Sequence, residues 1–238
     1  NGGTAWVGNA QMPTDDESMT VASILPGGDQ HATFVGWMNH VTGFLATLKT
    51  STGKPVPFIL RPWHEYNGSW FWWGEKETTP EQFKGLWNMF QDHVNAELPT
   101  NVVWAFSPNL DGLWTKERFL QKYPGDDRVD LIGEDAYQWG TEEQFVIGIK
   151  ADLTFLNDFA KKADKPIAIT ECGYKNSPDP TWWTRVLKPI MDKYPISYFL
   201  TWRNCKTEHF GCSKDLGTAE DFMQLYKAKN TLFLKDIQ

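Results

Sequence analysis

Several features that would point to other classes of protein are scarce or absent in this sequence. No run of about 18 apolar residues occurs, so no segment is predicted to span a membrane. Acidic residues outnumber basic ones by 30 to 23, and the net charge of −7 argues against a nucleic-acid partner, which needs a basic surface. There are only three cysteines; Cys205 and Cys212 bracket a six-residue loop, and pairing or two free thiols are equally compatible with that spacing.

Signatures of cofactor and metal chemistry are also missing. No glycine-rich phosphate loop occurs, His64 and Glu65 lack the second histidine of an H-E-x-x-H zinc motif, and the other histidines do not share metal-ligand spacing. We therefore predict no cofactor. No low-complexity linker or repeat divides the 238 residues, so we expect one domain.

What the sequence has in excess is tryptophan, with 13 residues. Aromatic faces stack on the C–H faces of sugar rings, so this number suggests a carbohydrate-binding cleft in addition to a core. The net negative charge fits a neutral substrate.

Strand-like and helix-like patterns alternate along the chain. Apolar runs predict strands at residues 57–61, 102–106, 129–132, 167–170 and 197–201, with one more short strand at 21–25. Helical periodicity and capping signals predict helices over residues 30–50, from 79 through 94, from about 116, over 141–162 and 181–193, and from about 219 to 227.

This alternation predicts a parallel sheet with helical crossovers. Polar and aromatic residues follow the strands at their C-terminal ends, which is where a (β/α)8 barrel carries its catalytic groups. A doubly wound sheet is the alternative, but it lacks the support of a phosphate loop. Five strands are found instead of eight, and three further units would need about 100 residues. We therefore expect residues 1–238 to be the C-terminal part of one catalytic barrel, covering about strands 4–8 and lacking the N-terminal strands.

Two glutamates end apolar runs. Glu65 lies in the segment Arg-Pro-Trp-His-Glu-Tyr-Asn-Gly-Ser-Trp-Phe-Trp-Trp-Gly of residues 61–74, and Glu171 lies in Ile-Ala-Ile-Thr-Glu-Cys-Gly of residues 167–173. A carboxylic acid among aromatic rings can protonate a glycosidic oxygen. Two carboxyl groups at strand ends are the minimum equipment of a glycoside hydrolase.

The segment 61–74 resembles the acid/base motif of the glycoside hydrolase family 26 β-mannanases. The resemblance extends over nearly the whole chain, through Ile-Leu-Pro-Gly-Gly at 24–28, Glu-Cys-Gly at 171–173, Thr-Trp-Arg-Asn at 201–204 and the closing Ala-Glu-Asp-Phe at 219–222. It implies that Glu65 ends the fourth barrel strand as general acid/base, and that Glu171 ends the seventh as nucleophile. The family is retaining, so the two carboxyl groups are expected about 5–5.5 Å apart, with the pKa of Glu65 raised.

The same resemblance implies roles for the residues around the two glutamates. His64 would support the sugar at the −1 subsite, Tyr137 would donate a hydrogen bond to Glu171, and Trp202 would form a platform with Arg203 beside it. Without the motif, a core histidine, tyrosine and tryptophan and a surface-paired arginine would be the plainer interpretations. Trp70 and Asn109 are further candidates for substrate contacts.

Two departures from the family pattern bear on the subsites. Cys172 replaces a phenylalanine that often follows the nucleophile, and the loop between Cys205 and Cys212 follows an active-site strand. We interpret Cys172 as a small buried residue and not as a nucleophile.

The resemblance implies a retaining endo-β-1,4-mannanase that acts on mannan, glucomannan or galactomannan. An exo-acting mannobiohydrolase, a related enzyme for mixed-linkage glucan or xylan, and a non-catalytic glycan-binding barrel remain alternatives, as does one half of a split barrel. The chain starts Asn-Gly-Gly without an apolar leader, so we expect a signal peptide to have been removed or to lie outside it, and the protein to be secreted, periplasmic or on the cell surface.

Overall fold

The structure is a computed structural model that describes residues 19–98, 101–202, 209–212 and 216–237. The chain forms two compact units. The N-terminal unit comprises residues 1–109 and 115–131, and the C-terminal unit comprises residues 110–114 and 132–238. Each unit is described below by itself.

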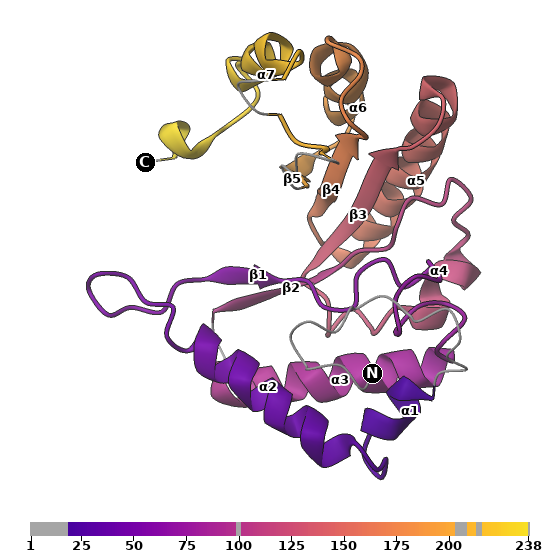
Figure 1. The fold of residues 1–238 in the computed structure, drawn as a ribbon, viewed down its shortest axis with the longest axis vertical. Coiled ribbons are helices and arrows are strands. Elements are labelled where there is room, and N and C mark those ends of the chain that lie inside the picture. The colour runs from indigo at the N-terminus through magenta and orange to yellow at the C-terminus, as the bar shows by residue number, and fades with distance from the viewer. Residues whose placement is uncertain (1–18, 99–100, 203–208, 213–215, 238) are drawn as a thin grey trace. The chain divides into compact units, whose positions relative to one another are not determined.

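The N-terminal unit pairs two parallel strands and covers them with helices. Strand β1 (Phe58–Leu60) pairs with β2 (Val102–Phe106), in the register Phe58 to Val102. Its helices are α1 (Thr20–Ile24), α2 (His31–Leu45), α3 (Pro80–Glu97) and α4 (Lys116–Lys122). Helices α2 and α3 contact each other and lie on the same side of the two strands (Figure 1).

The predicted start and apolar face of α3 are confirmed. The Thr79 side chain accepts from the backbone N–H of Gln82, the Gln82 side chain accepts from the N–H of Thr79, and Pro80 takes the first helical position. The residues predicted to face the core are all buried: Phe83, Leu86, Trp87, Phe90 and Val94. This helix therefore fixes the layer beneath β1 and β2.

The C-terminal unit contains three parallel strands in chain order. Strand β3 (Leu131–Gln138) pairs with β4 (Ile167–Tyr174), which pairs with β5 (Ile196–Thr201). Helix α5 (Glu142–Ala163) connects β3 to β4, and the π-helical turn η1 (Trp183–Leu187) with α6 (Lys188–Met191) connects β4 to β5. After β5 come α7 (Ala219–Tyr226) and the short 3-10 helix η2 (Leu234–Asp236). Parallel pairing with helical crossovers agrees with the prediction.

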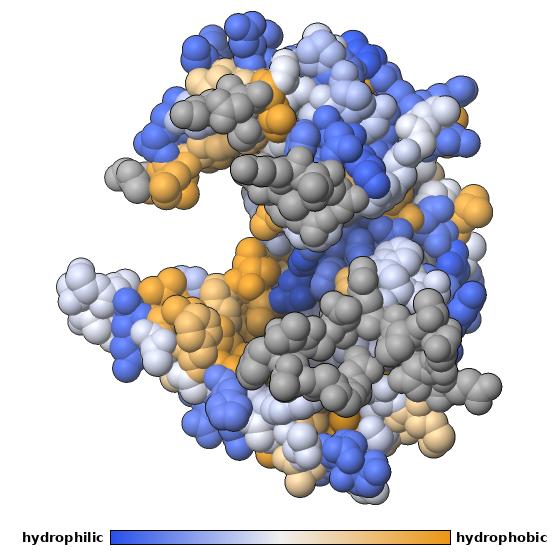
Figure 2. Space-filling view, viewed as in Figure 1, coloured by the Kyte–Doolittle hydropathy of each residue, from blue (hydrophilic) through white to orange (hydrophobic). Residues whose placement is uncertain are grey.

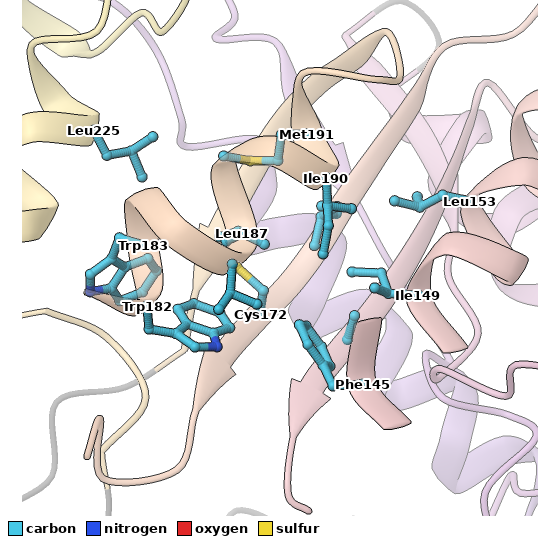
Figure 3. Packing of buried hydrophobic residues seen from close by; sticks show 13 residues of the cluster. Phe145, Ile149, Leu153, Cys172, Trp182, Trp183, Leu187, Ile190, Met191 and Leu225 are labelled. Atoms are coloured by element: carbon cyan, nitrogen blue, oxygen red, sulfur yellow. The ribbon is translucent and has the colours of Figure 1, made fainter. Parts of the chain in front are cut away.

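The core of the C-terminal unit lies between its strands and helices. Ile149 and Leu153 of α5 and Leu187 and Ile190 of the η1–α6 segment point toward one another there (Figure 3). Cys172 of β4 is fully buried in the same cluster, which confirms that it is a buried filler, and burial raises the pKa of its thiol. This layer supports the outer face of β3 and β4 and leaves their other face to polar side chains.

Two predictions for the N-terminal segment were wrong. Of the residues predicted as a strand at 21–25, the first four belong to helix α1, because Val21 and Ile24, three positions apart, bury the same helical face. Helix α2 spans His31–Leu45 and not residues 30–50. The chain turns at residues 50–53, where the N–H of Thr50 donates to the Lys54 carbonyl and Gly53 has a φ of 81°.

Strands β3 and β4 both extend beyond their predicted ends. They were predicted to stop at residues 132 and 170, but they continue to Gln138 and Tyr174. Asp135, Tyr137 and Glu171 therefore lie within strands and not after them. The apolar pattern ends early because these strand segments are buried among polar partners, which hydrophobic periodicity does not detect.

The segment predicted as one helix over residues 181–193 changes from π-helical to α-helical geometry. A π-helical turn, Trp183–Leu187, runs directly into the short helix Lys188–Met191. Pro189 lacks the N–H that would bond to the Arg185 carbonyl in a continuous α-helix, which explains a wider turn at this point.

Apolar side chains are exposed on the first and the last strand, β1 and β5. Ile59 of β1 and Leu200 of β5 are 44% and 47% exposed, and apolar surface is open to solvent on the face shown in Figure 2. Strands of a complete parallel barrel are covered on both faces. These positions are therefore consistent with a chain that holds part of a barrel.

A pair of carboxyl groups is buried between β3 and α5. Glu134 is fully buried and faces Asp152, whose Oδ2 accepts backbone N–H bonds from Asp111 and Gly112, both at 2.7 Å. In the part of the chain that the structure describes, no donor of another residue reaches either Glu134 oxygen. Burial, and then the charge of Asp152, raise the pKa of Glu134 well above its usual range. Burial also raises the pKa of Asp152, but the two backbone donors oppose it, so we place the shared proton on Glu134.

This pair predicts a pH dependence of stability. The native state holds a proton on Glu134 that the unfolded chain releases above the ordinary glutamate pKa, so the free energy of unfolding should fall as pH rises from there toward the raised native pKa. The slope is at most about 1.4 kcal/mol per pH unit. Glu134→Gln keeps a donor toward Asp152 and should remove this slope in urea unfolding between pH 5 and 8.

The matched control is Glu143→Gln on the exposed face of α5, the helix that carries Asp152, and this variant should keep the wild-type slope. Parallel stability curves for wild type and Glu134→Gln would mean that Glu134 is ionised in the native protein.

Candidate active site

In the N-terminal unit, Glu65 sits on a strained backbone just after β1. Its φ is +53°, and Trp63 has the same value, which non-glycine residues rarely adopt. The N–H of Glu65 donates to the carbonyl of Ser107, which follows β2, at 2.9 Å. The segment is thus tied to the neighbouring strand in a conformation that local propensity alone would not choose.

The Glu65 carboxyl group is buried and held by a tryptophan. Trp70 donates its indole N–H to Glu65 Oε2 at 2.8 Å, while 39% of the Trp70 surface stays exposed. The Trp70 ring packs against Gly68, where an added Cβ would lie 2.4–2.6 Å from ring carbons. Gly68 therefore provides the space that lets the indole reach the carboxyl group.

His64 lies in an aromatic wall beside Glu65. Its ring is 4.9 Å from the Phe71 ring, which stacks on Trp73 at 4.4 Å between centroids. Trp73 is buried and donates its indole N–H to the His64 carbonyl at 2.7 Å. Of the three tryptophans at 70, 72 and 73, the first is thus the exposed one, as expected for a substrate contact, and Trp73 supports the backbone at His64.

Asn109 is fixed by a reciprocal pair of hydrogen bonds. Its N–H donates to the side-chain oxygen of Asn67, and the Asn67 side-chain amide donates to the Asn109 carbonyl, both at 2.8 Å. These bonds join the loops after β1 and β2 through the Asn109 backbone. The segment Asn-Gly-Ser at 67–69 matches the N-glycosylation pattern, but both ends of the Asn67 side chain are engaged here, so we interpret Asn67 as an unmodified structural residue.

In the C-terminal unit, Glu171 lies on β4 next to Tyr137 of β3. The Tyr137 hydroxyl donates to Glu171 Oε2 at 2.5 Å, which is the contact predicted from the family resemblance. Burial, and then the charge of Glu171, raise the pKa of Tyr137 far above its usual range. The phenol therefore remains a hydrogen-bond donor at any working pH.

Asp135 belongs to the same buried network but was not predicted as a site residue. It is fully buried on β3, and its Oδ1 accepts a hydrogen bond from Thr170, the residue before Glu171, at 2.7 Å. Its sequence signal was its place in a polar stretch, after Glu134 and two residues before Tyr137. That signal is readable only when the strand is known to continue past Ile132.

Trp202 follows β5 and borders this network. Its ring centroid lies 5.9 Å from that of Tyr137, and 37% of its surface is exposed. Its backbone N–H donates to the Cys172 carbonyl at 3.4 Å. Arg203 and Cys205 fall outside the described residues. The substrate contact predicted for Arg203 therefore stays a prediction, and pairing and two free thiols stay alternatives for Cys205 and Cys212.

The structure thus assembles two clusters, each at the C-terminal end of parallel strands. The N-terminal unit gathers Glu65, His64, Trp70 and Asn109, and the C-terminal unit gathers Glu171, Tyr137 and Trp202. None of the helices in the described ranges is long and apolar enough to cross a membrane.

Parallel strands alternate with helices, and one glutamate follows β1 while another lies in the C-terminal half of β4. These features define the class as a partial (β/α)8 barrel, which confirms the predicted fold class. The chain belongs to glycosyl hydrolase family 26, whose family model matches residues 2–217.

Similar proteins agree with this assignment. A solved β-mannanase of this family from Bacteroides ovatus is 39% identical, superposes with a TM-score of 0.90, and is matched over 95% of this chain and 66% of its own. A mannan endo-1,4-beta-mannosidase from Bifidobacterium adolescentis is 28% identical over 206 residues, 80% of this chain and 21% of that protein. An endoglucanase H from Acetivibrio thermocellus is 34% identical over 119 residues, 47% of this chain and 13% of that protein. The chain therefore spans less than two thirds of each of these relatives.

The contact between Gly68 and Trp70 predicts the effect of Gly68→Ala. The Gly68 backbone is held by bonds to Glu65 and Glu75, so the added methyl group should displace the indole and break its bond to Glu65. A crystal structure of the variant would show this directly. Because Trp70 is partly exposed and can move, we expect only about 1 kcal/mol of lost stability.

Gly43→Ala is the matched control. Gly43 lies in α2 with no atom within 4 Å of an added Cβ, so this change should stabilise the protein by about 0.5–1 kcal/mol. An unmoved Trp70 ring in Gly68→Ala would contradict the proposed role of the glycine.

Proposed function

We propose that this chain carries the two catalytic glutamates of a retaining endo-β-1,4-mannanase. The observation that carries the proposal is the buried Glu171 carboxyl group, which accepts a 2.5 Å hydrogen bond from Tyr137 in a chain that belongs to glycosyl hydrolase family 26. Such a bond stabilises the charged form of a carboxylate and fixes its direction, as a nucleophile requires.

In the first step, Glu171 attacks the anomeric carbon of the sugar at the cleavage point. Glu65 gives a proton to the departing glycosidic oxygen, so that the leaving sugar departs as a neutral alcohol. Trp70 orients the Glu65 carboxyl group through its indole N–H. The product of this step is a covalent glycosyl ester on Glu171.

In the second step, Glu65 acts as a base. It takes a proton from water, which attacks the same carbon and releases Glu171 with overall retention of configuration. His64 and Trp202 line the two clusters and are proposed contacts of the reacting sugar. In a complete protein, the two carboxyl groups should lie about 5–5.5 Å apart, the separation typical of retaining enzymes.

Azide rescue distinguishes the two roles. With a dinitrophenyl β-mannobioside, Glu171→Ala should be almost inactive, and added azide should enter the vacated space and give an α-mannosyl azide. Glu65→Ala should lose about 10²- to 10⁴-fold in kcat on mannan. With the activated substrate it should still form the glycosyl-enzyme, which azide then converts to a β-mannosyl azide.

Glu143→Ala, an exposed carboxylate on α5, is the control and should keep wild-type kinetics. Near-full activity of either catalytic variant, or the same azide anomer from both, would overturn the assignment of roles.

The substrate is proposed from the names of the relatives. The Bacteroides and Bifidobacterium proteins are named as mannan-cleaving enzymes, whereas the Acetivibrio relative is named an endoglucanase. We therefore favour mannan, glucomannan or galactomannan and keep other β-glycans as the second candidate. A polymeric substrate cannot enter a cell intact, so we propose that the protein acts outside the cytoplasm.

Product analysis tests this choice. The full-length protein should cleave mannohexaose into mixed oligosaccharides whose new ends have the β configuration. Mannobiose as the sole product would replace endo action by exo action. Cleavage of xylan or mixed-linkage glucan without cleavage of mannan would discard the substrate but keep the two glutamates, and binding without any cleavage would favour a glycan-binding protein.

The proposal concerns one catalytic barrel domain and not this chain in isolation. The chain spans 66% of the Bacteroides enzyme, and Ile59 and Leu200 leave apolar strand surface exposed. We therefore place the activity in the complete barrel.

A further inference from the structure

A large aromatic side chain beside the Glu171 cluster has no role in the reaction described above. Trp139 comes directly after β3, two residues beyond Tyr137, and 60% of its surface is exposed. Tryptophan carries more apolar area than any other residue, and leaving most of it in water forgoes stabilisation. An exposed tryptophan held in place next to a candidate catalytic carboxylate needs an explanation.

Trp139 is held firmly in spite of its exposure. Its ring packs edge-on against Phe210, with centroids 5.2 Å apart, and lies 6.2 Å from the Tyr137 ring. Phe210 is fully buried and packs so closely on Gly173 that an added Cβ there would lie 2.5 Å from the Phe210 Cβ. The platform beneath Trp139 is therefore rigid.

The backbone around the platform is also fixed. The N–H of Asn176 donates to the His209 carbonyl at 2.7 Å, and the N–H of His209 donates to the Asn176 side chain. Gln138, the residue before Trp139, is buried and accepts the indole N–H of Trp182 at 2.7 Å. A rigid, preorganised aromatic surface binds a ligand with little loss of conformational entropy.

A cation lies over the ring. The Lys175 ammonium group is 5.1 Å from the Trp139 ring centroid. The backbone N–H of Lys175 donates to the Gln138 carbonyl at 3.5 Å. Because the lysine side chain is flexible, the ammonium group can move to the edge of the ring when a ligand stacks, where it offers hydrogen-bond donors next to the stacking surface. Sugars present this pair of features in complement, with C–H groups on a ring face and hydroxyl groups around its edge.

We propose that Trp139 is a sugar-stacking platform for a neutral glycosyl unit adjacent to the reacting sugar, and that Lys175 donates hydrogen bonds to the hydroxyl groups of that unit. The proposal rests on the proposed function, because it takes Glu171 to be the nucleophile. Trp139 and Lys175 would then contribute to the binding of longer substrates and would not take part in the chemical step.

The test is calorimetric binding of β-1,4-manno-oligosaccharides of two to six sugars to the full-length protein in a Glu171→Ala background. Trp139→Ala should weaken binding in proportion to chain length, by about tenfold for mannohexaose. Trp139→Phe keeps an aromatic face and should restore most of the loss. Lys175→Met keeps the stem of the side chain but removes its donors, and should weaken mannohexaose binding by about two- to tenfold.

Trp37→Ala is the matched control. Trp37 lies on helix α2 of the N-terminal unit with 41% of its surface exposed, and its removal should leave binding at every length unchanged. Unchanged binding by Trp139→Ala at all lengths would overturn the inference. An equal loss at all lengths that phenylalanine does not rescue would also overturn it, because it would indicate a structural role.

Failure of the Trp139 inference can be distinguished from failure of the proposed mannanase function. If the parent Glu171→Ala protein bound no manno-oligosaccharide and the wild type cleaved none, the mannanase proposal would fall, and this inference with it. If the parent bound and the wild type cleaved, only the comparison of Trp139 variants would decide.

Discussion

The constraint on which the C-terminal unit depends is the complete burial of β3. All eight residues of this strand, from Leu131 to Gln138, are buried, although half of them are polar or aromatic with a hydroxyl group. A buried polar group without a partner costs several kcal/mol, so each one needs a specific neighbour. Tyr137 bonds to Glu171, Asp135 accepts from Thr170, and Gln138 accepts from Trp182.

The hydrogen bonds of β3 lie on two faces of the strand, and each face has a different function. On one face, Asp135 and Tyr137 position the segment around Glu171. On the other face, Gln138 and Glu134 connect the strand to the helical layer, where Gln138 accepts from Trp182 and Glu134 faces Asp152 with a raised pKa. The candidate nucleophile is thus oriented by the same hydrogen bonds that allow the strand to be buried, and rigidity at Glu171 comes from the fold itself.

The N-terminal unit reaches a comparable result by different means. Glu65 stands on a backbone of positive φ and not within a strand, and Trp70 reaches its carboxyl group because Gly68 leaves room for the ring. Strain of this kind persists only where surrounding bonds enforce it, and here the bond from Glu65 to Ser107 and the Asn67–Asn109 pair do so. Such strain lowers local stability, as is common at preorganised sites.

The sequence by itself determined the order of strands and helices, the capped start and buried face of α3, the two glutamates and the family that they indicate. Those features rest on local patterns: apolar periodicity, a capping box and a long motif. Only the tertiary structure decided that β3 and β4 continue through polar residues, that 21–24 is helical, that Asp135 joins the network and that Trp139 stands exposed on Phe210. The reason is physical, since a buried polar residue and a solvated one look alike in sequence, and their partners lie tens of residues away along the chain.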